Sequence, residues 1–222
     1  MSSLVRTYVK TNPLFHRVKQ LMTSTFGATP TVDHVAIHTR QKIVLSWDEV
    51  RDAALQPEVY HFPKFQATAR WYKLPRSPLK RLFMTTYQPT SLPTISSFAD
   101  YSTVFHYNPF LAWTTLFDQH INHIALAVPD ITQATEACVQ AGIAMNTEGG
   151  LYKISQDGLL LQTATMAVPL AYTFPNGDTH TVPYTFVELV QRKTDCNGAE
   201  RDGFEQDNAL RIFSSTTDTT SS

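Results

Sequence analysis

An α+β fold is predicted for this chain, with two similar modules that curl mixed or antiparallel sheets around a shared cavity. The first observation is that 120–192 has the order strand, helix and several short strands, which is typical of a βαβββ module. The second is a weaker copy of that order over about 31–110. The third is that each copy opens on Asp or Asn, then His, a β-branched residue and Ala, at 33–36 and 122–125. This repetition indicates two related halves.

The first 30 residues are predicted to be a helical segment. Pro13 suits the first turn of a helix, and apolar residues recur after it at helical spacing. These residues are Leu14, Val18, Leu21 and Met22. A transit peptide is the alternative, because basic and hydroxyl residues precede Asp33 and no acidic residue does.

The first module is expected to contain a strand, a helix and two further strands. Ser46 and Glu49 form a capping-box pattern where the helix would begin. The Pro- and Ser/Thr-rich stretch 88–108 is expected to be a surface connection with a short helix near its end. The regular segments expected are the strand 32–39, the helix 46–55 and the strands 67–72 and 81–87.

The second module has clearer helix-capping and turn residues. Asp130 is a capping residue for a helix that Gly142 would end. The expected strands are 123–128, 143–146, 152–155, 159–164, 171–174 and 182–191, with turns at 149–150, 157–158 and 176–177. Both modules and a C-terminal extension would form one domain over 31–213, and the Ser/Thr-rich tail 214–222 is expected to be disordered.

The composition argues against several classes of function. The chain has 222 residues, 42% hydrophobic and 17% charged, with a net charge of -1, so it has no basic surplus for nucleic acid or an anionic membrane. No apolar run approaches the roughly 18 residues of a membrane span. Its two cysteines form no zinc or disulfide pattern, so a reducing, cytoplasmic location is expected, with organelle targeting left open. Serine-nucleophile and phosphate-loop motifs are absent from the sequence.

Two histidines and one glutamate are the candidate metal ligands. His34 and His123 open the two repeated strands beside small alanines, and Glu188 lies within a run of strand formers. A buried carboxylate needs a cation, and two imidazoles with one carboxylate form a facial triad that suits Fe(II). The alternative is that the histidines are ordinary core residues and that Glu188 pairs with Arg192 or faces solvent. The other histidines are not expected to bind metal, and His106, His120 and His180 are expected in loop-like contexts.

The chain resembles the 2-oxoadipate dioxygenase/decarboxylase family of the vicinal-oxygen-chelate superfamily. The resemblance covers about 14–216. It rests on Asp-His-Val-Ala at 33–36, Tyr-His-Phe-Pro at 60–63, Asn-His at 122–123, Asp-Gly-Leu-Leu-Leu-Gln-Thr at 157–163, Phe-Val-Glu-Leu-Val-Gln-Arg at 186–192 and Gly-Phe-Glu at 203–205, followed by Asn-Ala at 208–209 and Ile-Phe at 212–213. It implies a non-haem Fe(II) enzyme that takes a 2-oxo acid and O2, releases CO2 and leaves a 2-hydroxy acid. It assigns the metal to His34, His123 and Glu188.

One position departs from the family pattern. Family members commonly carry arginine four residues after the first histidine, where it binds a substrate carboxylate, and this chain has His38 there. His38 and Arg40, which lie on the same predicted strand face, are candidates for binding the substrate, and Gln162 and Arg192 are further candidates on the cavity wall. Two other functions therefore stay open. One is a lyase, isomerase or hydrolase with another divalent metal, and the other is a non-catalytic ligand-binding module. The oligomeric state is left open.

Overall fold

The computed structural model describes residues 3–40, 57–73, 81–87, 92–146, 150–203 and 205. The chain forms two compact units. The first unit holds 1–5, 35–122 and 168–185, and the second holds 6–34, 123–167 and 186–222. Three strands contribute residues to both units: β1 (Val32–Thr39), β5 (Gln119–Ala127) and β10 (Thr179–Arg192). Helix α1 (Ser3–Thr11) likewise contributes to both.

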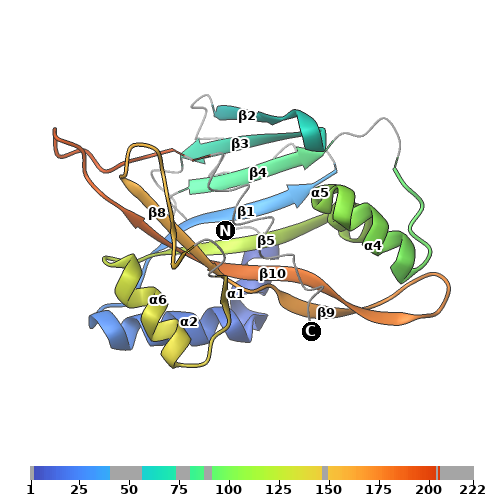
Figure 1. Ribbon diagram of the computed structural model, residues 1–222, viewed down its shortest axis with the longest axis horizontal. Coiled ribbons are helices and arrows are strands. Elements are labelled where there is room, and N and C mark those ends of the chain that lie inside the picture. The colour runs from blue at the N-terminus through green and yellow to red at the C-terminus, as the bar shows by residue number, and fades with distance from the viewer. Residues whose placement is uncertain are drawn as a thin grey trace. The chain divides into compact units, whose positions relative to one another are not determined.

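In the first unit, four strands lie side by side in the order β2-β3-β4-β1 (Figure 1). They include β2 (Glu58–Phe62), β3 (Ala67–Lys73) and β4 (Arg81–Tyr87), and a short 3-10 turn, η1 (Pro63–Phe65), follows β2. Strand β3 pairs antiparallel with both β2 and β4. Strand β9 (Val168–Thr173) pairs antiparallel with the first part of β10. The strands expected near 67–72 and 81–87 are thus confirmed.

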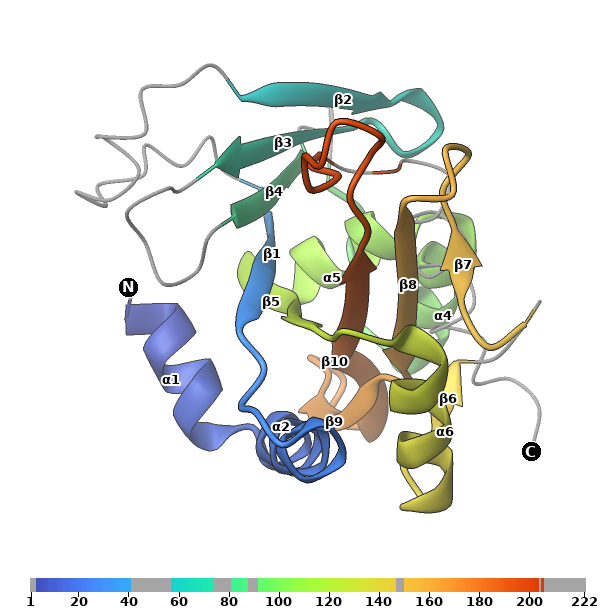
Figure 2. The ribbon, with the colours of Figure 1, turned by 90° about the vertical axis from the view of Figure 1, so that its left-hand side faces the viewer.

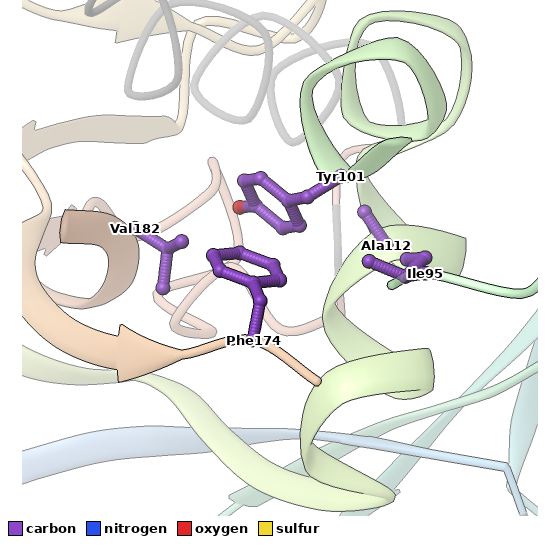
Figure 3. Close-up of a cluster of buried hydrophobic side chains, with 5 residues drawn as sticks. All are labelled: Ile95, Tyr101, Ala112, Phe174 and Val182. Atoms are coloured by element: carbon purple, nitrogen blue, oxygen red, sulfur yellow. The ribbon is translucent and has the colours of Figure 1, made fainter. Parts of the chain in front are cut away.

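Two consecutive helices, α4 (Phe98–Tyr107) and α5 (Pro109–Phe117), also belong to the first unit. Ser97 and Asp100 form a capping box at the start of α4, which is the short helix expected near the end of the 88–108 connection. Residues from both helices, from the segment before α4 and from the β9–β10 hairpin form a buried apolar cluster (Figure 3). Its members are Ile95, Tyr101, Ala112, Phe174 and Val182.

In the second unit, the strand order is β5-β10-β8-β6, and β7 pairs with β8. The short strands are β6 (Met145–Asn146), β7 (Lys153–Ile154) and β8 (Leu160–Thr165). Strand β10 runs parallel to β5 and antiparallel to β8. Figure 2 shows β10, β8 and β7 side by side. This mixed sheet positions the candidate site.

The second unit also contains two helices that contact each other, α2 (Pro13–Phe26) and α6 (Ile131–Gln140) (Figure 1). Asn12 and Asp130 cap their first turns through their side chains. Gly27 ends α2 with a positive φ of 70°, a conformation that glycine adopts without steric cost. The helices predicted after Pro13 and after Asp130 are therefore confirmed.

Some expectations cannot be compared with the structure. The expected helix 46–55, the turn residue Gly149 and the tail 214–222 lie outside the described residues. The module boundaries 31–110 and 120–192 stay a prediction. The loop-like context expected for three histidines is wrong: His106 lies in helix α4, His120 is buried in strand β5, and His180 lies in strand β10.

Candidate metal centre

Three side chains from strands β1, β5 and β10 meet within the second unit: His34, His123 and Glu188. The parallel register aligns Phe186 with His123 and Glu188 with Ala125, so these side chains share one face of the β5–β10 pair. The Phe186 ring stacks on the His123 ring with centroids 4.7 Å apart, which fixes the orientation of that imidazole. Alternation along the strands thus brings the predicted ligands together.

The donor atoms of these residues form a nearly equilateral triangle. His34 Nε2 lies 3.1 Å from His123 Nε2 and 3.2 Å from Glu188 Oε2, and His123 Nε2 lies 3.1 Å from the same oxygen. A divalent metal with ligand bonds of about 2.1 Å at right angles needs donor atoms about 3.0 Å apart. The observed spacing fits three adjacent positions around such an ion. His34 and Glu188 are almost fully buried, and the His123 side chain is 13% exposed.

Asp33 determines which nitrogen of His34 faces the centre. Its Oδ1 lies 2.8 Å from His34 Nδ1, and Arg192 donates to both of its oxygens, from Nε at 2.7 Å and from Nη2 at 2.9 Å. Burial opposes ionisation, but the bonds from His34 and Arg192 hold the pKa of Asp33 well below its usual range. The ionised carboxylate accepts the proton-bearing Nδ1–H. When the His34 ring carries only this proton, its Nε2 presents a lone pair to the centre.

The electrostatics of the centre favour a bound cation. Burial opposes the charge on Glu188, but the two histidines lower its pKa to about 2, so it is a carboxylate at neutral pH. Burial lowers the pKa of His123 more than the nearby carboxylate raises it. The pKa of His34 is raised, because Glu188 and Asp33 outweigh the effect of burial. A carboxylate and two imidazole nitrogens that converge on one point match the donor set of a divalent metal.

Gln162 orients the carboxylate of Glu188. Its Nε2 donates to Glu188 Oε1 at 2.6 Å from the neighbouring strand β8, and its side chain is buried. This bond occupies Oε1, and the other oxygen, Oε2, faces the histidines. The sequence placed Gln162 on the cavity wall as a substrate-binding candidate, and the structure places it against a predicted metal ligand.

The family model described as 2-oxoadipate dioxygenase/decarboxylase matches residues 81–206, which is more than half of the chain. The chain belongs to this family. A rice protein named 2-oxoadipate dioxygenase/decarboxylase, chloroplastic/amyloplastic, is 24% identical over 97% of this chain and 77% of its own length. The resemblance stated from the sequence motifs is therefore confirmed.

Solved structures confirm the predicted fold class. The rice hydroxyglutarate synthase, solved in complex with 2-oxoadipate, superposes with a TM-score of 0.81 at 23% identity, over 97% of this chain and 90% of that one. A glyoxalase superfamily protein of Ralstonia eutropha gives 0.64 at 16% identity, over 86% and 80%. At these identities the likeness concerns the fold. This member of the 2-oxoadipate dioxygenase/decarboxylase family therefore has a sheet-dominated α+β fold of the glyoxalase type.

The remaining substrate-binding candidates have protein partners. Arg192 binds Asp33, so the alternative in which it pairs with Glu188 is wrong. In the first unit, Arg40 Nε donates to Asp118 Oδ1 at 2.9 Å. The buried His38 ring lies against Phe110, with ring centroids 4.8 Å apart. Substrate contacts of His38, Arg40, Gln162 and Arg192 stay predictions.

Two residues of this family member were not singled out by sequence reasoning. Asp33 precedes the first histidine and belongs to the repeat, and its position beside a predicted ligand is the signal that could identify it. Lys153 is 8% exposed on strand β7, and no sequence pattern marked it. Both are charged and buried, which is uncommon without a function or a partner.

The family relationship also bears on location. The rice relative's name places that protein in chloroplasts or amyloplasts, which lends no support to the expected cytoplasmic location. Within the part of the chain that the structure describes, no helix is both long enough and apolar enough to cross a bilayer.

Proposed function

We propose that this chain is an Fe(II)-dependent dioxygenase/decarboxylase of 2-oxo dicarboxylic acids, with 2-oxoadipate as the first candidate. O2 is consumed, the carboxyl group beside the ketone leaves as CO2, and a 2-hydroxy acid one carbon shorter remains. The observation that carries the proposal is the triangle of donor atoms from His34, His123 and Glu188, each within about 3.2 Å of the others. Membership of the family supports the choice of reaction.

Three protein donors would hold the metal from one side. Bound Fe(II) would supply positions for the 2-oxo acid and O2 and the electrons that activate O2. The protein's own part is to hold these donors in place. Asp33 keeps the lone pair of His34 directed inward, and Gln162 keeps Oε2 of Glu188 turned toward the histidines.

Small, buried residues lie beside Glu188 on both neighbouring strands. Ala125 lies opposite Glu188 on β5, and Ala164 lies opposite it on β8, so the carboxylate has a small residue on each side. Both alanines are completely buried, and the apolar Phe186 and Val190 flank Glu188 along β10. A surface of this kind excludes water around the reacting groups.

The experiment is an anaerobic reconstitution with Fe(II), followed by exposure to O2 and 2-oxoadipate. We expect one iron per chain, O2 uptake matched by CO2 release, and a 2-hydroxy acid product. His123→Ala and Glu188→Ala should lose the iron and the O2 uptake, whereas His106→Ala, on the exposed side of α4, should keep both. The proposal fails if iron-loaded protein consumes no O2 with any 2-oxo dicarboxylic acid of five to seven carbons. Turnover with Zn(II) or Ni(II) in the absence of O2 would also contradict it.

A further inference from the structure

The chain folds back on itself directly after strand β10, within the second unit. Thr194 forms an antiparallel β-bridge with Glu200. The backbone N–H of Arg201 then donates to the carbonyl oxygen of Lys193 at 2.9 Å. This hairpin-like turn brings Arg201 back beside the end of β10, where Arg192 lies.

The side chain of Arg201 binds a carboxylate in the turn between β7 and β8. That turn and the segment after β10 lie at the same end of the sheet (Figure 2), and the backbone N–H of Lys193 donates to the carbonyl oxygen of Leu159 at 2.8 Å. Arg201 Nε donates to Asp157 Oδ2 at 3.0 Å, and the side chains are 19% and 43% exposed. The ion pair therefore joins the turn to the returning segment.

The other oxygen of Asp157 serves the turn itself. Oδ1 accepts from the backbone N–H of Leu159 at 3.0 Å and from the hydroxyl of Ser155. The Ser155 oxygen in turn accepts from the backbone N–H of Leu160 at 2.9 Å, which fixes the start of β8. Strand β8 carries Gln162, so these local bonds must be kept in any variant that tests the ion pair alone.

The backbone of the returning segment holds Arg192. The carbonyl oxygens of Arg201 and Gly203 accept from Arg192 Nη1 at 3.0 and 3.1 Å. Gly203 has a positive φ of 80°, a conformation that glycine adopts without steric cost. The guanidinium is rigid and planar, so the position of Nη1 also sets the direction of Nε and Nη2, which bind Asp33.

We propose that Asp157 and Arg201 are positioning residues of the candidate metal centre. Their ion pair holds the segment 201–203 against Arg192, and Arg192 keeps the Asp33 carboxylate directed at Nδ1 of His34. The inference rests on the proposed function, because it takes His34 to be a metal ligand. It adds that the orientation of this ligand depends on a partly exposed ion pair at the end of the sheet.

Asp157→Asn breaks the ion pair and keeps the turn, because the amide oxygen still accepts the two local bonds. We expect this variant and Arg201→Met each to weaken Zn(II) binding about twofold to fivefold, the range for one exposed ion pair. The measurement is a competition titration against a chelator of known affinity. Asp195→Asn is the matched control, since Asp195 accepts from the backbone N–H groups of Asn197 and Ala199 in a similar turn. It should bind Zn(II) as wild type does.

A double variant separates positioning from a general loss of stability. If Asp157 acts through Asp33, Asp157→Asn adds little to the loss of Zn(II) affinity in Asp33→Asn, whereas independent effects multiply. Multiplied losses would overturn the proposal, as would wild-type affinity in both Asp157→Asn and Arg201→Met. Arg201→Lys replaces Arg201→Met if thermal unfolding shows that the methionine variant does not fold.

These measurements need no turnover, so the two proposals can fail separately. If iron-loaded wild type consumes no O2 but the coupled loss of Zn(II) affinity is found, the proposed function fails and the positioning role stands. If O2 is consumed and the coupled loss is absent, the positioning role fails alone.

Discussion

At the scale of single residues, the candidate centre depends on what surrounds the ligands as much as on the ligands themselves. His34 is oriented by Asp33, Asp33 is held by two bonds from Arg192, and Glu188 is oriented by Gln162. Metal-binding histidines commonly donate their second nitrogen to a carboxylate in this way, and loss of such a partner weakens metal binding.

We expect Asp33→Asn to weaken divalent metal binding ten- to a hundredfold. The amide oxygen can still accept the Nδ1–H of His34, but it carries no charge and leaves the guanidinium of Arg192 without its carboxylate. The measurement is a competition titration of Zn(II) or Co(II) against a chelator of known affinity. Asp130→Asn serves as the control, because asparagine keeps the cap of helix α6. An unchanged affinity in Asp33→Asn would show that Asp33 does not position the ligand.

At the scale of elements, strand β5 carries two different histidines. His123 lies in the candidate centre, whereas His120 lies among the aromatic rings of Trp113, Phe117 and Tyr184 in the first unit. Neither ring nitrogen of His120 has a hydrogen-bond partner among the described residues, and burial lowers its pKa to about 3. This histidine is therefore neutral in the folded protein.

The pKa of His120 predicts a loss of stability in acid. Unfolding restores a pKa near 6.5, so the unfolded chain takes up a proton that the folded chain rejects. The stability is complete above pH 6.5 and falls as the pH drops toward 3, by about 2 kcal/mol at pH 5 from this group alone. Urea unfolding of metal-free protein at pH 7 and pH 5 measures the loss. In His120→Phe the loss should be about 2 kcal/mol smaller than in wild type. An equal loss in both proteins would show that His120 is not the group responsible.

Sequence patterns predicted much of the local structure but not the long-range contacts of the residues around the candidate ligands. The helices after Pro13 and Asp130 follow from capping residues and helical periodicity, which are local signals. The bond between Asp33 and Arg192 joins residues that are 159 positions apart, and no local sequence pattern predicts such a pair. The short strand of Lys153 has no periodicity that would show which side faces inward. For His120, no local signal shows that strand β5 begins at Gln119.

The residues of the candidate centre could be predicted, because the sequence repeats the pattern around the two histidines. Asp-His-Val-Ala and Asn-His-Ile-Ala mark the two histidines, and a carboxylate within a strand-forming run marks Glu188. The substrate-binding residues carry no such repetition. Gln162 and Arg192 are predicted to line the cavity, but Gln162 contacts Glu188 and Arg192 contacts Asp33. A polar residue beside a predicted metal ligand can bond to the protein there as well as to a substrate.

At the scale of the whole molecule, the candidate centre joins parts of the chain that are distant in sequence. His34 and His123 are 89 residues apart, and Gln162 and Glu188 are 26 apart. A ligand that binds only the folded state adds its binding free energy to the stability of the fold. Metal binding should therefore stabilise the folded chain against unfolding.

We expect Zn(II) at about a hundred times its dissociation constant to add about 2.7 kcal/mol of stability. For a chain of this size that corresponds to a rise in melting temperature of roughly 5–10 °C. Differential scanning calorimetry with and without metal measures the shift. Glu188→Ala should abolish it, and His106→Ala should retain it. A rise of the same size in Glu188→Ala would indicate that the metal binds elsewhere.

The guanidinium of Arg192 also contacts residues that follow strand β10 in the sequence. Its Nη1 donates to the carbonyl oxygens of Arg201 and Gly203, at 3.0 and 3.1 Å, while Nε and Nη2 hold Asp33. One rigid, planar group thus links an irregular stretch near the end of the chain to the residue beside a metal ligand. We therefore expect substitutions in that stretch to alter the metal affinity of the candidate centre from a distance, without changing any predicted ligand.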